Sequence, residues 1–358
     1  MTTEFIWQLP TSGDGRYGDA SQTRRGERNA GSRAPFTDGV SDPRGKAFNF
    51  LDHLHQIARA ADLAGFDGIQ IQNDLAGDES WIVAGYLARA SRRLKLLTEF
   101  EASRGSAVYA AKNAASFQRF TGGRFAWQIS QGGDAATRRQ HGDYAAQADI
   151  LPRIGEFVKV AKGVLTQSPF SFKGRFFEVL DGGFNGPLAN KPVPLVYLSG
   201  NSPEALELSA QWADVHVLDA APLEELKEAI STLQALAAGQ GRSLSFGLRI
   251  DVLARETEDE AVHDAQRFLA QSGRAVGSSD PIVAPGLWAG FATERTGAKA
   301  SLVGSYGTVA ERLAKYAEAG ISSFVLAAIP HFEEAYRIGE QVLPVVRSRL
   351  ATKLSQAA

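Results

Sequence analysis

One strand-like stretch of the sequence carries an arginine and an aspartate among apolar residues. It reads GLRIDVLA, residues 247–254, and Arg249 and Asp251 lie two positions apart, on the same face of a strand. Arginine is rarely buried without a partner. Either Arg249 pairs with Asp251, or both line a polar pocket in which the guanidinium group binds a sulfonate, phosphate or carboxylate. The sequence leaves both interpretations open.

A second stretch, SGNSPEAL, joins a turn of small residues to the start of a predicted helix. Ser202 is placed to cap this helix, and Pro203 occupies its first position. The free N–H groups at a helix start, approached through small side chains, suit a phosphate. The candidate phosphate ligands are Ser199, Gly200, Asn201 and Ser202. An ordinary capped helix explains the same residues.

Other common chemistries find no support in the sequence. The absence of cysteine excludes disulfides, thiolate metal sites and a cysteine nucleophile. The histidines form no HExxH pattern, and the chain has no GxSxG elbow. The GDG after the first strand is not followed by a predicted helix at the spacing of a dinucleotide-binding site. We therefore expect no metal site. His331, just after the last predicted strand, is a candidate acid or base, and a surface or helix-capping histidine fits this position as well.

The elements that must position these residues are strands that alternate with amphipathic helices. This alternation predicts an α/β fold, a single (β/α)8 TIM barrel with long loop insertions, rather than a doubly wound sheet. The predicted strands are residues 5–9, 67–72, 94–101, 124–131, 193–200, 213–218, 245–254 and 322–328. In such barrels the active site lies at the carboxyl ends of the strands.

Two segments read as insertions at that end of the barrel. Residues 18–49 have no apolar period, and their arginines form a basic cluster. This cluster fits a solvated loop, or a lid that closes on an anionic substrate or cofactor. A second segment, from about residue 273 to 304, is broken by Gly and Pro.

Composition limits the remaining classes. The chain has 358 residues, of which 44% are apolar and 22% charged, and its formal net charge is -2. Residues 1–358 are expected to form one domain, because α/β barrels are large. The near-neutral charge gives no general field for nucleic acid. The sequence has no run of about 18 apolar residues and no signal-peptide pattern, so we expect a cytoplasmic protein without a membrane segment.

Taken together, these motifs resemble the bacterial luciferase-like flavin monooxygenases, in particular the alkanesulfonate monooxygenase branch. The similarity extends over nearly the whole chain and rests on LPTSGDGRY, RFAWQIS, GLRIDVLARETEDEA, LWAG and the segment at residues 302–340. The resemblance implies a TIM barrel that uses O2 and reduced FMN from a separate NAD(P)H-dependent flavin reductase. It also implies cleavage of a small anionic organosulfonate into sulfite and an aldehyde, and a homodimer or homotetramer.

The same resemblance assigns roles to individual residues. The turn from Ser199 to Ser202 would hold the FMN phosphate, and Gln128 falls where relatives place an Asn near the flavin. Arg249 and Arg295 match arginines of the desulfonating site, where positive charge binds the sulfonate and stabilises negative charge in the reaction. Ser12, in the first loop, is placed to donate a hydrogen bond to the flavin.

The chain also departs from that branch. The alkanesulfonate enzymes have His at Ser12, Cys at Gly77, His at Asp251 and Tyr at Ile329, and a further Tyr aligns near Leu151. A pocket altered in this way, with Asp251 able to accept hydrogen bonds from hydroxyl groups, suits a bulkier sulfonate such as sulfoquinovose. Three alternatives stay open: monooxygenation of another substrate such as a sulfone, a deazaflavin-dependent hydride transfer, and a barrel that binds flavin or an anion without turnover.

Overall fold

Eight parallel strands close into a barrel in the computed structural model, which describes residues 3–11, 50–75, 77–271 and 281–357. Around the barrel the strand order is β13-β1-β2-β3-β4-β7-β8-β9, and β9 closes the ring by pairing with β13. The barrel strands are β1 (Glu4–Leu9), β2 (Gly68–Ile71), β3 (Lys95–Glu101), β4 (Phe125–Ser130), β7 (Leu195–Ser199), β8 (Val215–Asp219), β9 (Ser245–Arg255) and β13 (Ile321–Ala327). The predicted TIM-barrel fold is confirmed, and each predicted strand overlaps one of these.

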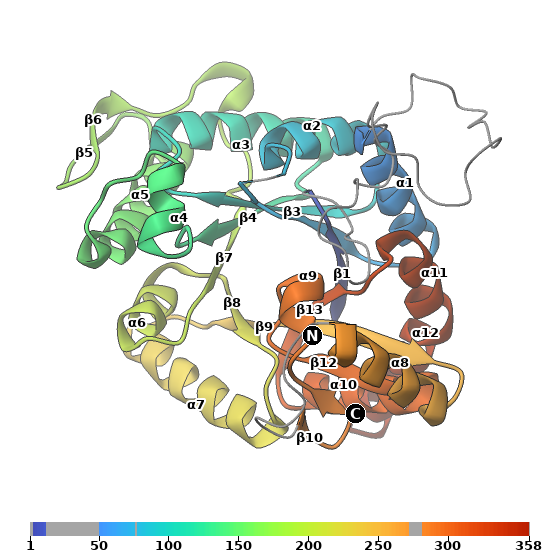
Figure 1. Ribbon diagram of the computed structural model, residues 1–358. Coiled ribbons are helices and arrows are strands. Elements are labelled where there is room, and N and C mark those ends of the chain that lie inside the picture. Colours follow the sequence, from blue (N-terminus) through green and yellow to red (C-terminus); the bar gives the residue numbers. More distant parts are fainter. Residues whose placement is uncertain (1–2, 12–49, 76, 272–280, 358) are drawn as a thin grey trace.

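Helices surround this barrel on its outside (Figure 1). They are α1 (Phe50–Leu63), α2 (Ser80–Ala90), α3 (Ala107–Thr121), α4 (Ala135–Gln140), α5 (Ile150–Thr166), α6 (Pro203–Trp212), α7 (Leu223–Gly239), α10 (Tyr306–Glu318), α11 (His331–Gln341) and α12 (Leu343–Ala357). Helix α1 is followed by Gly65, whose φ of +87° lies in the left-handed region that glycine favours.

The main core fills the space between the strands and the helices. Alternate residues of β1, namely Phe5, Trp7 and Leu9, are fully buried there. Their neighbours in the sequence point into the barrel, because successive side chains of a strand face opposite sides. The middle of the barrel is apolar and includes Ile6, Leu97, Ala126, Val217 and Val325.

A polar cluster closes the amino-terminal end of the barrel. Glu4 Oε1 accepts hydrogen bonds from Tyr197 Oη at 2.7 Å and from Ser323 Oγ at 2.9 Å. Lys95 forms an ion pair with the same carboxylate. Because these four side chains satisfy one another, this end of the barrel needs no ligand.

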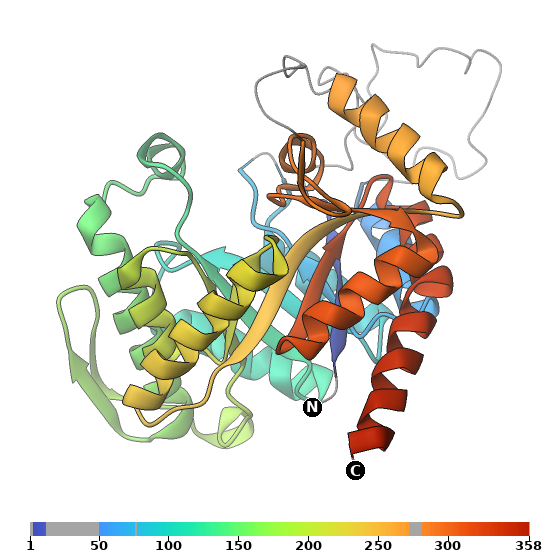
Figure 2. The same cartoon turned by 90° about the horizontal axis from the view of Figure 1, so that it is seen from below.

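The second predicted insertion contains more regular structure than its composition suggests. It follows α8 (Glu258–Gln271) and holds β10 (Ile282–Ala284), β11 (Leu287–Trp288), α9 (Ala292–Thr296) and β12 (Ser301–Ser305). Strand β12 pairs with the second half of β9 in parallel, and β10 and β11 extend the sheet from it. Figure 2 shows α8 and α9 at one end of the barrel, while α12 ends at the other.

A short antiparallel hairpin, β5 (Phe170–Lys173) and β6 (Glu178–Gly182), follows α5, as the sequence indicates for this region. Among the described helices, none is long and apolar enough to cross a membrane.

Candidate active site

A layer of polar side chains lies inside the carboxyl end of the barrel. Its members are register partners: Gln8 with Gln70, Glu99 with Gln128, and Asp219 with Arg249. Partners in neighbouring strands point to the same face of a sheet, and these residues continue the inward rows that start with Glu4, Ile6 and Leu97. In β1, β3 and β8 the inward residue two positions earlier belongs to the apolar middle of the barrel, namely Ile6, Leu97 and Val217. The barrel therefore changes from an apolar middle to a polar end at this layer.

Amide groups connect one side of the layer. Gln70 Nε2 donates to Gln128 Oε1 at 3.1 Å and lies 3.4 Å from Glu99 Oε2. Gln8, Gln70 and Gln128 are all buried. Within the described residues, neither amide atom of Gln8 has a hydrogen-bond partner, and Gln70 Oε1 has none either. Buried amides without hydrogen-bond partners cost free energy, so these atoms are candidates for hydrogen bonds to a bound polar molecule.

Glu99 is the carboxyl group of this layer with the most altered titration. Burial raises the pKa of Glu99 to about 7, although the charge of Arg249 and a hydrogen bond from the Asn73 backbone N–H act in the opposite direction. Nearby Glu101 and Asp74 add to the increase. At neutral pH this carboxyl is therefore divided between its neutral and charged forms.

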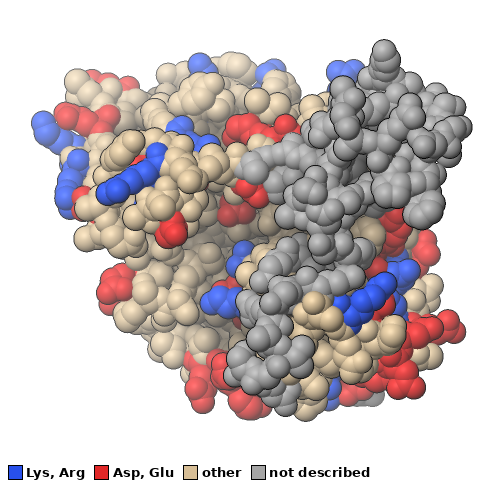
Figure 3. Space-filling model, in the orientation of Figure 1, with Lys and Arg blue, Asp and Glu red and all other residues tan. Residues whose placement is uncertain are grey.

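Arg249 forms its ion pair with a residue of the next strand. Its Nη2 lies 2.9 Å from Asp219 Oδ1, and Lys299 Nζ lies 2.9 Å from Asp219 Oδ2. Burial opposes ionisation of Asp219, but Arg249 and Lys299 outweigh it and lower the pKa of this carboxyl. Two cations thus share one carboxylate. Figure 3 shows acidic and basic side chains beside the hollow in this face of the molecule.

The rim above β3 carries a second network. Glu101 Oε1 accepts a hydrogen bond from Asn73 Nδ2 at 3.0 Å and lies 3.3 Å from both Arg104 Nη2 and His141 Nδ1. Ser103 Oγ donates to the other oxygen of Glu101 at 3.1 Å. This carboxylate is fully engaged by its neighbours on three loops, so it fixes the rim beside Glu99.

The turn after β7 has the helix cap that the sequence predicts. Ser202 Oγ accepts a hydrogen bond from the Ala205 backbone N–H at 3.2 Å, and Pro203 is the first residue of α6. Gly200 has φ +125°, and a Cβ at this position would lie 2.7 Å from Gln131 Nε2 and 2.9 Å from Ala205 Cβ. Gln131 Nε2 donates to the Ser199 carbonyl at 3.3 Å. Only glycine fits this turn.

A cavity of about 500 Å³ connects this turn to the ion pairs of the barrel mouth. Its lining includes Gly200 and Asn201 of the turn together with Asp219 and Lys299. A ligand in this cavity therefore lies beside the turn that precedes α6 and beside the Lys299–Asp219 ion pair.

Comparison with known families decides the class of this barrel. The profile of the family described as luciferase-like monooxygenase matches residues 29–323. The chain belongs to the luciferase-like monooxygenase family.

Solved structures agree with this assignment. The luciferase-like chain is similar to a riboflavin lyase with modified FMN and riboflavin (17% identity, TM-score 0.73, 98% of this chain and 92% of that chain). It is also similar to an EDTA monooxygenase from Chelativorans sp. BNC1 (17% identity, TM-score 0.72, 98% and 94%). A third similar structure is an F420-dependent secondary alcohol dehydrogenase with an F420-acetone adduct (17% identity, TM-score 0.64, 97% and 99%). At such identities the likeness shows the fold.

The residues of this luciferase-like barrel fit a flavin-type cofactor. The glycine turn before α6 leaves room for a phosphate at the helix start, where N–H groups favour an anion. The unpartnered amide atoms of Gln8 and Gln70 offer both donors and acceptors. The polar edge of a flavin ring also carries donors and acceptors, so this set matches it.

Some of the site residues predicted from the sequence lie at the carboxyl end of the barrel. Gln128 and Arg249 belong to the polar layer, and Gly200 and Asn201 of the turn line a cavity together with Asp219, the partner of Arg249. Asp251 is fully buried, and its Oδ2 lies 2.5 Å from Ser301 Oγ. Of the two readings of Arg249, its ion pair with Asp219 supports the polar pocket.

Other predicted residues do not join this layer or lie outside the described residues. His331 is 2% exposed, and its ring lies edge-on to that of Trp7, with centroids 6.3 Å apart. Trp7 belongs to the core outside the barrel, so this contact does not bring the histidine to the mouth. Ser12 and the basic loop lie outside the described residues, as does the side chain of Arg295 within α9. Ile329 is buried and Gly77 is partly buried.

Sequence reasoning missed several members of the layer. Gln8 and Gln70 each interrupt a short apolar strand, in FIWQL and GIQI, at inward positions. These two glutamines could have been recognised from the sequence, because a polar side chain in a buried strand is rarely left without a hydrogen-bond partner. Asp219 and Lys299 carry no local signal, since they meet Arg249 only through the fold.

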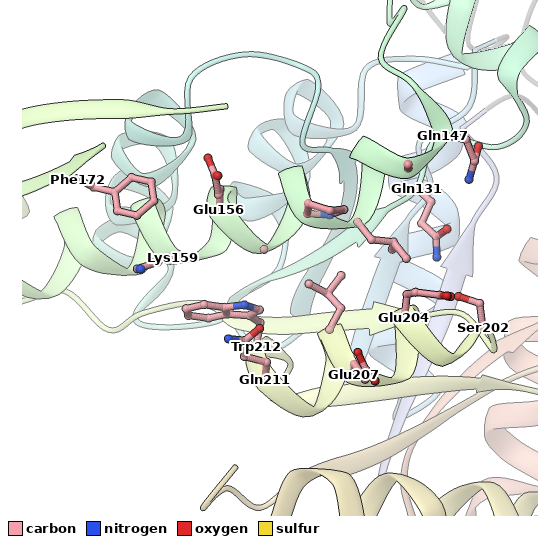
Figure 4. A pocket seen from close by; sticks show the side chains of 15 residues that line it. Gln131, Gln147, Glu156, Lys159, Phe172, Ser202, Glu204, Glu207, Gln211 and Trp212 are labelled. Atoms are coloured by element: carbon pink, nitrogen blue, oxygen red, sulfur yellow. The ribbon is translucent and has the colours of Figure 1, made fainter. Parts of the chain in front are cut away.

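A separate groove of about 940 Å³ runs between α5 and α6, outside the barrel (Figure 4). Gln131 and Ser202 lie at one end of it, and Phe172 and Lys159 lie at the other. Leu151, near the position where relatives place a tyrosine, lines this groove. The groove therefore begins at the turn before α6 and leads away from the polar layer.

Proposed function

We propose that this luciferase-like protein is a monooxygenase that uses reduced FMN and O2 to cleave the C–S bond of an anionic organosulfonate. The products are sulfite and an aldehyde. One observation carries the proposal: Arg249 and Lys299 share the single carboxylate of Asp219 at the carboxyl end of the barrel. Two cationic side chains that converge on one carboxylate can both bind an anionic substrate.

The cofactor would be held at the carboxyl end of the barrel. The turn from Ser199 to Ser202 would bind the FMN phosphate, and the amides of Gln8, Gln70 and Gln128 in the polar layer would meet the ring. When bound, reduced flavin supplies the electrons that activate O2. One similar solved structure contains a modified FMN, and another contains an F420-acetone adduct. We assign FMN because the proposed reaction uses O2.

The residues of this chain bind and orient the substrate. Arg249 offers a planar pair of N–H donors that matches two oxygens of a sulfonate, and Lys299 adds a point charge. We assign Arg295 to the same role from its place in α9, close in sequence to Lys299. Ser301 Oγ donates a hydrogen bond to Asp251 Oδ2, and this contact positions Asp251 at the end of β9.

Within the sulfonates we propose a hydroxylated compound such as sulfoquinovose. The supporting observation is the number of amide and carboxyl groups in the layer, which hydrogen-bond hydroxyl groups well. We further propose that residues 1–358 act as one domain, that a separate NAD(P)H-dependent reductase supplies the reduced flavin, and that the enzyme forms a homodimer or homotetramer.

The test is a screen of sulfite release with purified protein, FMN, NADH and a flavin reductase. Alkyl, aryl and sugar sulfonates are supplied separately, and a parallel series uses reduced F420 without a reductase. We expect sulfite from at least one sulfonate, most from the sugar sulfonate, and only when FMN and O2 are present. Reduction of an added ketone by reduced F420, and no sulfite from any sulfonate, would instead assign hydride transfer.

A further inference from the structure

We propose that His216 donates a hydrogen bond from Nε2 to the terminal phosphate of the cofactor, in the cavity of about 500 Å³ beside the turn before α6. The inference rests on the proposed function, in which the FMN phosphate binds at that turn. It adds a residue of β8 to the phosphate ligands that the sequence predicts, residues 199–202.

His216 is a buried part of the wall of this cavity. The cavity follows the end of β8, because its lining includes the inward Val217 and the outward His216. Gly200 and Asn201, which lead into α6, line the same space. The side chain of His216 is deeply buried, with 1% of the residue exposed. A polar ring and the start of a helix therefore face one volume.

Ser209 of α6 fixes the orientation of the imidazole ring. Its Oγ lies 2.8 Å from Nδ1 of His216. Among the described residues, this contact is the only hydrogen bond that either side chain forms. Because Nδ1 is turned towards α6, Nε2 is the ring nitrogen left for the cavity.

The same contact assigns the proton on the ring. Ser209 is fully buried, so its hydroxyl hydrogen needs an acceptor, and Nδ1 of His216 is the acceptor within reach. A neutral imidazole that accepts at Nδ1 carries its hydrogen on Nε2. Burial lowers the pKa of His216 to about 4, partly offset by Asp219, so the ring is neutral at pH 7. His216 therefore offers the cavity an N–H donor.

The other groups of the lining indicate a phosphate as the acceptor. The start of α6 favours an anion, and Lys299 contributes an ammonium group to the same cavity. The carboxylate of Asp219 is paired with Arg249 and Lys299, and Glu225 is exposed on α7, where solvent screens its charge. The terminal phosphate of FMN and inorganic phosphate share the required chemistry, since each has several acceptor oxygens.

The experiment compares FMN with riboflavin, which lacks the phosphate. Both flavins are kept reduced under anaerobic conditions, and quenching of tryptophan fluorescence in the full-length protein gives each Kd. His216→Phe keeps an aromatic ring and removes the donor. We expect it to raise the Kd for FMN by about 10–100-fold, the loss of one hydrogen bond to a charged acceptor, and the Kd for riboflavin by less than about threefold.

Two further variants test the assignment to one N–H group. His216→Gln places an amide N–H near the position of Nε2 and should recover part of the FMN affinity. His263→Phe replaces an exposed histidine of α8 and should bind both flavins as the wild type does.

Nitrogen NMR of wild-type protein with 15N-labelled histidine gives a readout that does not depend on the folding of a variant. The chain has six histidines, and His216 should appear at pH 7 as a neutral ring protonated at Nε2. FMN and inorganic phosphate should each shift this N–H signal, whereas riboflavin should leave it nearly in place.

Two results would overturn the inference. One is an unchanged ratio of FMN to riboflavin affinity in folded His216→Phe. The other is a His216 signal that FMN does not move, including the case in which inorganic phosphate alone moves it and the cavity binds a different phosphate compound. Sulfite release together with either result removes the role of His216 alone. A response of His216 to FMN without sulfite from any sulfonate removes the desulfonation alone.

Discussion

Arg249 on β9 and Asp219 on β8 are register partners whose side chains form an ion pair, with Nη2 2.9 Å from Oδ1. This pairing holds the guanidinium group at the carboxyl end of the barrel rather than along its own strand. Lys299 reaches the other oxygen of Asp219 from the insertion after β9. The charge of the site is thus assembled from three parts of the chain, and each contribution can be tested.

Replacing Arg249 with alanine should impair turnover more than cofactor binding. We expect kcat/KM for the sulfonate to fall by about 10²–10³-fold, as when one charge-stabilising donor is lost. The Kd for FMN should change by less than about threefold, because the turn before α6 is intact. Steady-state kinetics and flavin fluorescence measure the two effects. Arg249→Lys is the matched control and should recover part of kcat/KM, since it restores the charge without the planar fork. Wild-type turnover in Arg249→Ala would contradict the assignment.

Gly200→Ala should weaken flavin binding. An alanine Cβ would lie 2.7 Å from Gln131 Nε2, and the φ of +125° disfavours any side chain. The turn must then move, and we expect the Kd for FMN to rise by about tenfold, the loss that follows when a phosphate site loses about one hydrogen bond. Gly239→Ala, at the end of α7 with no atom within 4 Å of its Cβ, is the control. Equal FMN affinity in both variants would argue against a phosphate site at this turn.

Tyr197→Phe should affect stability and leave chemistry unchanged. It removes the hydrogen bond to Glu4 at the amino-terminal end of the barrel, away from the polar layer. We expect the free energy of unfolding to fall by about 1–2 kcal/mol, the usual effect of losing one partner of a buried charged acceptor. Urea unfolding measures it, with Tyr144→Phe, at a 77% exposed position, as the control. A large change in kcat would show that the two ends of the barrel are coupled.

His216 should make the protein less stable in mild acid. Burial lowers the pKa of His216 to about 4, partly offset by Asp219, while an unfolded histidine titrates near 6.5. The unfolded chain therefore binds more protons between these values, and stability falls as pH decreases from about 6.5 to 4, by at most about 3 kcal/mol. His216→Gln should show a shallower loss over this range in urea unfolding, whereas the exposed His263→Gln should follow the wild type. Parallel curves for all three proteins would disprove the effect.

The barrel could be predicted because its strands are local patterns, whereas the site depends on contacts across the fold. Apolar residues predict strands in the segments FIWQL, GIQI and SFGLRI. The residue types of the turn before α6 predict its helix cap. Strand β12 escaped prediction because it lies in a stretch broken by Gly, and pairing with β9 stabilises it.

The partner of Arg249 shows the limit most clearly. Asp251 is two residues away and on the same face, yet the ion pair forms with Asp219, thirty residues earlier on the neighbouring strand. Likewise, the altered titration of Glu99 follows from enclosure by four strands and loops, which no spacing in LKLLTEFE reveals. The sequence indicated Arg249 and the turn before α6 as candidates, and only the fold shows which residues surround them.

The most direct test of the central claim is the ratio of sulfite formed to O2 consumed when reduced FMN is supplied to the full-length protein with a sulfonate. The account predicts sulfonate-dependent O2 uptake, a ratio close to one with the preferred substrate after background flavin oxidation is subtracted, and loss of both signals in Arg249→Ala. Oxygen uptake that no sulfonate alters, with no sulfite formed, would contradict it.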